Sequence, residues 1–233
     1  MPQNGSLPLY QQISELLIRD IAAGRLTDGA RLAPERDMAA GMGIAVGTLR
    51  KALADLTTKG LLERVQGSGN YIRAKTEVDS VYALFRLELP GGGGLPTAEV
   101  LSVARLAKPA DLPPFGTSAE AHRIRRLRRL SGAAAAVEEI WLDGSYIDRI
   151  AAEDLSESLY LFYRERLGLW IQRAEDQVGL GAVPGWAPDA FAPPSGTAAP
   201  LIERLSWAQD GTTAEFSRTW FDPKTARYVA RIR

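Results

Sequence analysis

Arginines at alternating positions in the second half of the chain are the residues best suited to bind an anion. Residues 122–130 read His-Arg-Ile-Arg-Arg-Leu-Arg-Arg-Leu. On a β-strand successive side chains point to opposite faces, so Arg126 and Arg128 would share one face. Paired guanidinium groups in a partly buried pocket need an anionic ligand or carboxylates to offset their charge. The spacing therefore indicates a site for a small carboxylate or phosphate.

The segment that follows supplies acidic partners for this strand. Ser131-Gly132 predicts a tight turn, and Val-Glu-Glu-Ile-Trp-Leu at 137–142 predicts an antiparallel partner strand. Glu138 would then lie near the two arginines. Three other interpretations stay open: a basic strand face neutralised by its own acids, a dimer contact, and nucleic-acid binding by the arginine run itself.

A second set of basic residues lies on a predicted helix near the N-terminus. Leu49, Leu53 and Leu56 repeat at helical spacing and mark the buried side of that helix. Arg50 and Lys51 fall outside this apolar stripe, so their charges are available for DNA phosphates and base edges.

The elements around this helix predict how it is positioned. Apolar residues at helical spacing over 13–21 indicate an earlier helix, and Pro34 suits the first turn of another. Short strands near 61–65 and 70–73 would flank a turn at Gly67. Three helices followed by a hairpin are typical of a winged helix-turn-helix, which places one helix in a DNA major groove.

Composition limits the class of protein. With 233 residues the chain is long enough for two domains, each with its own core. The absence of cysteine excludes disulfides and thiolate metal sites, and the single histidine, His122, leaves few partners for a nucleophile–base pair. We therefore expect no enzyme, no cofactor and no metal site. No run reaches the ~18 apolar residues of a membrane span, and the start lacks signal-peptide character, which predicts a cytoplasmic protein.

The formal net charge of zero hides an asymmetry between the two parts. Residues 1–75 hold ten Lys/Arg against seven Asp/Glu, whereas the rest hold 18 against 21. A mildly basic front and a mildly acidic back fit a DNA-binding module joined to a domain of another kind.

Residues 9–72 resemble the GntR family of bacterial transcription regulators, on the motifs Pro-Glu-Arg, Thr-Leu-Arg and Gln-Gly-Ser in register. The resemblance implies that the arginine after Pro-x, the polar start of the third helix and the wing glycine contact DNA. Guanidinium groups suit this chemistry because they grip phosphate or a guanine edge bidentately. With their neighbours, the expected DNA-binding residues are Arg36, Thr48, Arg50, Lys51, Gln66, Gly67 and Ser68.

Three positions depart from the family pattern. Where the family usually has Ser before the proline and Ser-Arg at the start of the third helix, this chain has Ala33, Ala45 and Val46. A lost Ser cap costs ~1 kcal/mol of helix stability, and a lost guanine-reading arginine removes ~1–3 kcal/mol of base discrimination. We therefore expect an operator that differs from the usual family sequence.

Four separated motifs between about 95 and 233 resemble the UTRA effector-binding domain of the HutC subfamily: Arg-Leu-Arg, Glu, Ser-Leu-Tyr and Glu-Phe-Ser-Arg, in that order. The resemblance implies a chorismate-lyase-like fold, with an antiparallel sheet, flanking helices and a small-molecule pocket. It also implies that the two arginines hold the anionic group of the effector. The expected effector-binding residues are Arg126, Arg128, Glu138, Ser158, Tyr160, Glu175 and Glu215.

These observations predict an α+β protein in three parts. They are a winged helix-turn-helix domain at 1–75, a linker with a glycine-rich loop at 76–94, and an effector-binding and dimerisation domain at 95–233. The loop Pro-Gly-Gly-Gly-Gly at 90–94 either is flexible or brings backbone N–H groups to a ligand. No Lys-Ser/Thr follows it, which argues against a P-loop.

The expected function is ligand-responsive transcription regulation. A homodimeric repressor would leave a palindromic operator when a small anionic metabolite, a carboxylate or a sugar phosphate, binds its C-terminal domain. The alternatives are a constitutive DNA-binding regulator with a degenerate pocket and a lyase-like enzyme.

Overall fold

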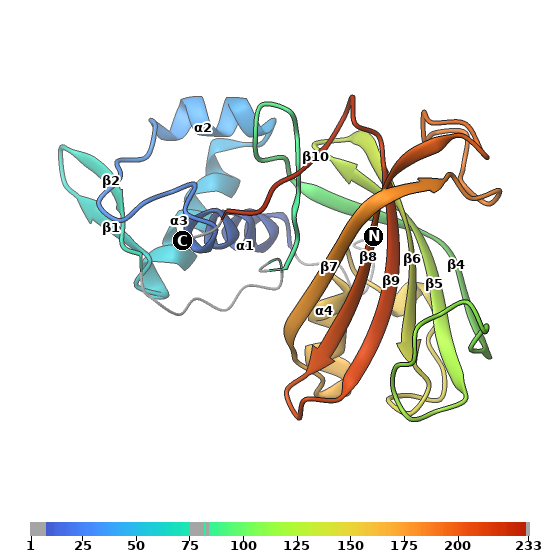
Figure 1. The fold of residues 1–233 in the computed structure, drawn as a ribbon. Helices are drawn as coiled ribbons and strands as arrows, with labels where there is room; N and C mark the ends of the chain where they lie inside the picture. The colour runs from blue at the N-terminus through green and yellow to red at the C-terminus, as the bar shows by residue number, and fades with distance from the viewer. Residues whose placement is uncertain (1–7, 75–81, 83, 232–233) are drawn as a thin grey trace. The chain divides into compact units, whose positions relative to one another are not determined.

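The structure is a computed structural model that describes residues 8–74, 82 and 84–231. These residues form two compact units: the DNA-binding unit, 8–95 with 228–231, and the effector domain, 96–227. Figure 1 shows helices and a hairpin in the first and a large antiparallel sheet in the second, which confirms the α+β class. The expected boundary at 75 lies outside the described residues, and the contacts group 84–95 and the chain's last described residues with the N-terminal helices.

The DNA-binding unit begins with the predicted winged helix-turn-helix order. Ile13, Leu17, Leu49, Leu56 and Ile72 are buried in one apolar core, so the stripes expected from helical spacing do face inward. The elements are α1 (Leu9–Ala22), α2 (Glu35–Met42), α3 (Val46–Thr58), β1 (Leu62–Val65) and β2 (Gly69–Ile72).

Backbone features of single residues set the ends of these helices. Pro34 directly precedes α2, and Gly43 ends that helix in the left-handed region at φ +66°. Neither Pro34 nor Ala45, at the start of α3, makes a side-chain capping hydrogen bond. The wing turns at Gly67, whose φ of +75° favours glycine.

Two short strands complete this unit. β3 (Leu87–Glu88) pairs with β10 (Arg227–Tyr228), which comes from the opposite end of the chain. The Val229 N–H donates to the Arg86 carbonyl at 2.8 Å and extends this pairing. The C-terminal segment is thereby tied to the linker.

The effector domain is built on a six-stranded antiparallel sheet. Its strand order is β4-β5-β6-β9-β8-β7, so β4 and β7 are its edges. Ser131 and Gly132, both with positive φ, form the predicted turn between the second and third strands of this order. The strands are β4 (Pro96–Ala107), β5 (Glu120–Leu130), β6 (Ala133–Asp143), β7 (Ile171–Ala182), β8 (Ala198–Ala208) and β9 (Thr213–Phe221).

Register divides the side chains of this sheet between two faces. Arg126 is paired with Glu138 on what we call the inner face, and Arg125 is paired with Glu139 on the outer face. The inner face carries η1 (Ala152–Asp154), α4 (Leu159–Phe162) and η2 (Tyr163–Leu167), the last being a turn of π-helix. Such turns are rare and are often found at functional sites.

Two loops cover the ends of the outer face. Phe115 packs with Trp141 and Phe216 at one end. Phe191 packs with Trp220 at the other end. Between the two covers the outer face is polar.

Candidate DNA-binding face and effector site

The predicted DNA-binding residues lie on α2, on α3 and in the wing. Arg36, Arg50 and Lys51 are exposed, and Thr48 is half-buried in the first turn of α3. Arg50 Nε donates to Glu35 Oε2 at 2.6 Å, and this hydrogen bond holds the pKa of Glu35 below its usual value. An exposed ion pair of this kind is weak, so DNA phosphate can compete for Arg50.

The wing residues differ in exposure and in hydrogen bonding within the protein. Gln66 and Gly67 are exposed, whereas Ser68 is half-buried and its Oγ hydrogen-bonds the Tyr71 hydroxyl at 2.6 Å. Arg64 on β1 is exposed and also contacts Glu35, at 2.9 Å. The sequence interpretation missed Arg64, although a basic residue in the first wing strand was visible in the sequence.

On the inner face, Arg126, Arg128 and Glu138 form what we call the inner-face cluster. Both arginines are only 4% exposed, so their charges are cut off from water. Glu138 Oε2 accepts from Arg126 Nη2 at 2.7 Å and from Arg128 Nη2 at 3.1 Å. Within the cluster, one carboxylate therefore faces two buried cations, and a further carboxyl group, that of Glu215, interacts with Arg126 from the adjoining network.

The electrostatics of the cluster follow from this imbalance. Burial alone would raise the pKa of Glu138, but the two guanidinium groups outweigh it and lower the pKa to about 2. Burial lowers the pKa of Arg126, and the neighbouring charge of Arg128 adds to that effect. An additional anion would relieve this strain.

A main-chain carbonyl also contacts both arginines of the cluster. The Glu157 carbonyl accepts from Arg128 Nη1 at 2.9 Å and from Arg126 Nη1 at 3.5 Å. Arg126 Nε is buried without a hydrogen-bond partner. A neutral carbonyl solvates the guanidinium groups but does not neutralise them, so the arrangement is suited to exchange it for an anion.

A second buried network lies beside this cluster. Glu215 Oε2 accepts from the Tyr163 hydroxyl at 2.6 Å, and its Oε1 accepts from Ser206 at 3.2 Å and from Tyr160 at 3.4 Å. Burial raises the pKa of Glu215. Burial and the Glu215 charge together raise the pKa of Tyr160 to about 12. The site thus offers hydroxyl and carboxyl groups next to two guanidinium groups.

The structure brings six of the seven predicted effector-binding residues to this face and leaves one away from it. Ser158 starts α4, and its Oγ accepts from the Leu161 N–H at 3.3 Å. Glu175 is exposed and is paired in register with Leu205, which places it on the outer face. Its neighbour Asp176 is on the inner face instead, where it holds Arg204 through bonds of 2.5 and 2.7 Å.

The sequence interpretation missed four inner-face residues. A period-two pattern was present on β8, but its register with β7 and β9 could not be read from the sequence. The residues are Tyr163, Asp176, Arg204 and Ser206.

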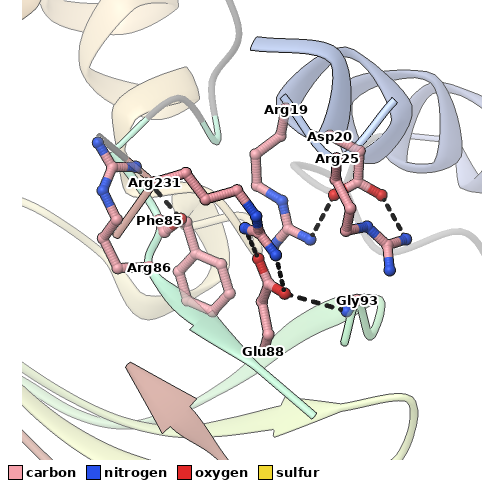
Figure 2. Close-up of polar contacts among 8 residues, drawn as sticks. All are labelled: Arg19, Asp20, Arg25, Phe85, Arg86, Glu88, Gly93 and Arg231. Atoms are coloured by element: carbon pink, nitrogen blue, oxygen red, sulfur yellow. Dashed lines mark hydrogen bonds and ion pairs between the residues drawn. The ribbon is translucent and has the colours of Figure 1, made fainter. Parts of the chain in front are cut away.

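In the DNA-binding unit a cluster that we call the tail clamp joins the linker to the C-terminal segment (Figure 2). Glu88, which is 5% exposed, receives a bidentate contact from Arg231, with Nη1–Oε1 at 2.6 Å and Nη2–Oε2 at 3.0 Å. This contact is the main cause of the lowered pKa of Glu88. Asp20 on α1 holds Arg19 at 3.0 Å and Arg25 at 2.7 Å beside it.

The glycine-rich loop packs into the tail clamp. The Gly93 N–H donates to Glu88 Oε2 at 3.4 Å. A Cβ on Gly92 or Gly93 would stand 3.1 or 3.0 Å from the Arg25 guanidinium, so only glycine fits comfortably against it. The loop therefore packs closely against Arg25, and the N–H of Gly93 is used within the protein.

Two kinds of feature are absent from the described residues. Among them no group of His, Asp and Glu could hold a metal ion. None of the described helices has the length and apolar character to cross a bilayer. The single histidine is buried, with Nε2 hydrogen-bonded to the Ile147 carbonyl at 2.8 Å.

A winged helix with exposed arginines, followed by a sheet domain with a buried cluster of two arginines and a glutamate, fits a ligand-sensing transcription regulator. Residues 9–72 match the bacterial regulatory proteins of the gntR family, and residues 92–227 match the UTRA domain. The chain belongs to the GntR family and has the HutC-like arrangement of domains. It is a DNA-binding transcriptional regulator with an effector-binding UTRA domain.

Individual relatives agree with this assignment. The chain is 69% identical over 229 residues to the HTH-type transcriptional regulator SmoD of Agrobacterium fabrum, covering 98% of each chain. It is 24% identical to the repressor NagR of Bacillus subtilis, covering 91% of this chain and 90% of that one. The crystal structure of the Bacillus subtilis regulator YydK shares the fold, with a TM-score of 0.53 at 19% identity over 97% of this chain and 100% of that one. These relatives are regulators and not enzymes.

Proposed function

We propose that this regulator is a repressor that leaves its operator when a small anionic metabolite, a carboxylate or a sugar phosphate, binds the inner-face cluster. It acts in the cytoplasm as a homodimer on a pseudo-palindromic operator, with one winged helix on each half-site. The observation that carries the proposal is the buried pair Arg126 and Arg128, which share the single carboxylate of Glu138.

The Glu157 carbonyl supplies the link between binding and movement. An anion that bonds Arg126 and Arg128 takes the donors now used by this carbonyl, at 3.5 and 2.9 Å. The segment before α4 then has to shift, and Tyr160 and Tyr163 with it, because they follow directly in the chain. The effector therefore favours a different arrangement of the inner face, which is the requirement for a ligand to act on a conformational equilibrium.

The tail clamp gives the shift a route to the DNA-binding unit. The chain passes between this unit and the effector domain at two places, before β4 and after β9, and the ends of both are joined by Glu88 and Arg231. A change in the effector domain thus acts on two joined segments rather than on one free linker. A coupling of ~1–3 kcal/mol, typical of allosteric proteins, is enough to weaken operator binding about 5- to 150-fold.

The repressor role is supported by the naming of a relative. NagR, 24% identical over nearly its whole length, is described as a repressor. A dimer with two-fold symmetry fits a family of regulators that binds two half-sites.

The test measures ligand binding and operator release on the same protein. A DNA site selected from a random pool by the wild-type protein serves as the operator, and glucose 6-phosphate, glycerate and inorganic phosphate serve as probes. A binding anion at ~100 times its dissociation constant adds ~2.7 kcal/mol to stability and shifts thermal unfolding visibly. The same anion should weaken operator binding at least fivefold.

Matched variants assign the effect to the cluster. Arg128→Lys keeps the charge but loses the fork and should lose most of the response, whereas Arg129→Ala, on the same strand outside the cluster, should keep it. Anion binding that leaves operator affinity unchanged would exclude release by the effector. Operator binding with no response to any anion would favour the constitutive regulator.

A further inference from the structure

The outer face of the effector sheet holds a groove separate from the inner-face cluster. The groove has a volume of about 490 Å³, which is within the range of small-molecule sites. It lies beside the loop that carries Phe115, and Leu112, Arg123, Glu139, Trp141 and Arg218 are among its lining residues. We call it the outer groove.

The charges that line the outer groove do not balance within it. Arg125 is paired with Glu139 at 2.7 Å. Arg218 is paired with Asp111 at 2.8 Å and with Glu203, which is not among the lining residues, at 3.0 Å. Arg123 forms no ion pair within the described part of the chain, and its Nε is buried without a hydrogen-bond partner. One cation thus faces the groove with a donor unused.

Apolar and aromatic side chains also lie around Arg123, beside the charged ones. Its guanidinium carbon lies 5.8 Å from the centroid of the Trp141 ring. The Trp141 Nε1 donates to Glu139 Oε1 at 3.2 Å, which fixes the ring in the wall of the groove. Leu106 and Leu112 line the same space. A ligand here meets one planar donor group and, beside it, the apolar side chains of Leu106 and Leu112.

We infer that the outer groove is a second ligand site, which binds small monocarboxylates with an apolar part. A planar carboxylate matches the fork of a guanidinium group, and its single charge matches the one cation left without a carboxylate. A phosphate dianion would bring a second negative charge next to Glu139 and Asp111. The site does not depend on the proposed function, because alternate residues of β5 build the two faces: Arg123 the outer one, Arg126 and Arg128 the inner one.

The test follows 4-fluorobenzoate by fluorine NMR in the presence of the full-length protein. Its neutral isostere 4-fluorobenzamide and inorganic phosphate as a competitor complete the probe set. We expect saturable binding of the benzoate, at least tenfold weaker binding of the benzamide, and no displacement by phosphate at equal concentration. Displacement by phosphate at that concentration would overturn the assignment to carboxylates.

Three variants locate the binding. Arg123→Gln should weaken benzoate binding at least tenfold, and Arg123→Lys should weaken it less, because it keeps the charge without the fork. Arg128→Lys, on the inner face, should leave it unchanged. Equal benzoate binding by the wild type and by Arg123→Gln would overturn the site. So would benzoate binding that is lost in Arg128→Lys and retained in Arg123→Gln. Because Arg123 forms no ion pair among the described residues, the Arg123→Gln protein should unfold at the same midpoint as the wild type. This measurement checks that the variant is folded.

Discussion

The arginines of the two units are placed in opposite ways. On the winged helix the side chain of Arg50 is 64% exposed, whereas on the inner face of the effector sheet that of Arg126 is 5% exposed. Water screens the first charge, so it needs no partner and stays available to a polyanion such as DNA. The second charge is cut off from water, so it requires an anion within the protein or in a ligand.

This difference separates what each set of arginines controls. Removing an exposed arginine should change DNA binding and leave stability nearly unaltered. Changing the buried set should alter stability and ligand binding together. The tail clamp is intermediate, because Glu88 is buried while the side chain of Arg231 is about 30% exposed.

The largest effect is expected from Glu138→Ala. This change leaves Arg126 and Arg128 buried without a carboxylate, and it should cost the effector domain ~3–5 kcal/mol. Urea unfolding followed by tryptophan fluorescence measures it cleanly, because all five tryptophans are in residues 96–227. Glu139→Ala on the outer face is the control. If both changes cost the same, burial of the arginines does not explain the difference.

Acid should reduce the stability of the effector domain through the same carboxylate. The pKa of Glu138 is about 2 in the folded protein and 4.5 in the unfolded chain, so the unfolded chain takes up the proton first as pH falls. The stabilisation is complete above pH 4.5 and decreases towards pH 2, by ~3 kcal/mol in all.

Fluorescence-detected unfolding between pH 5 and 2.5 checks this dependence. Burial raises the pKa of Glu215, so protonation of this group stabilises the folded protein as the pH falls, opposite to the effect of Glu138. The measurement is therefore made on the Glu215→Gln variant, which lacks this contribution. Adding Glu138→Gln should remove the acid dependence assigned to Glu138. Asp143 and Asp111, whose pKa values are also lowered by their cationic partners, leave a smaller slope in the double variant. A slope equal to that of the Glu215→Gln protein would contradict the assignment to Glu138.

A smaller effect is expected at the tail clamp. Arg231→Ala leaves the buried Glu88 without its bidentate partner, but the arginine is partly hydrated, so the loss should be about 1 kcal/mol. Hydrogen exchange should become faster in α1 and in 84–95, with the tryptophan-reported unfolding unchanged. Arg227→Ala, whose contacts are to nearby carbonyls of the tail, is the control. If an anion releases the operator more slowly from Arg231→Ala but not from Arg227→Ala, the result would support coupling through the tail clamp.

The smallest effect on stability should come from Arg36→Ala. An exposed arginine on a helix surface contributes within about 0.5 kcal/mol of zero. Operator affinity should nevertheless fall, and the slope of log affinity against log salt should decrease by about one. Arg166→Ala, an exposed arginine of the effector domain, should change neither quantity. An unchanged salt slope in Arg36→Ala would remove Arg36 from the DNA-binding face.

Much of the local structure could be predicted because it repeats along the chain. Helical spacing identified the buried sides of α1 and α3, and the residue types Ser131 and Gly132 predicted the turn between β5 and β6, where the structure has positive φ at both. Period-two alternation placed Arg126 and Arg128 on one face and Glu138 across from them. These patterns depend on neighbours in sequence, which the sequence displays directly.

Other parts depended on register and could not be predicted. Glu175 and Asp176 are adjacent, and only the pairing of β7 with β8 decides which of them is on the inner face. A shift of one residue would exchange them. The role of the glycine-rich loop could not be predicted either, because the residue that it packs against, Arg25, lies about 70 positions earlier in the chain.

By itself the sequence determined that this protein has a winged helix for DNA and an arginine-rich strand for an anion, because spacing and residue type are local properties. Tertiary structure alone decided that the two arginines are buried with the Glu157 carbonyl beside them. It also decided that Glu88 meets Arg231 across 143 positions of the chain. Burial and long-range pairing depend on how distant segments pack, and that packing decides which charges need a partner.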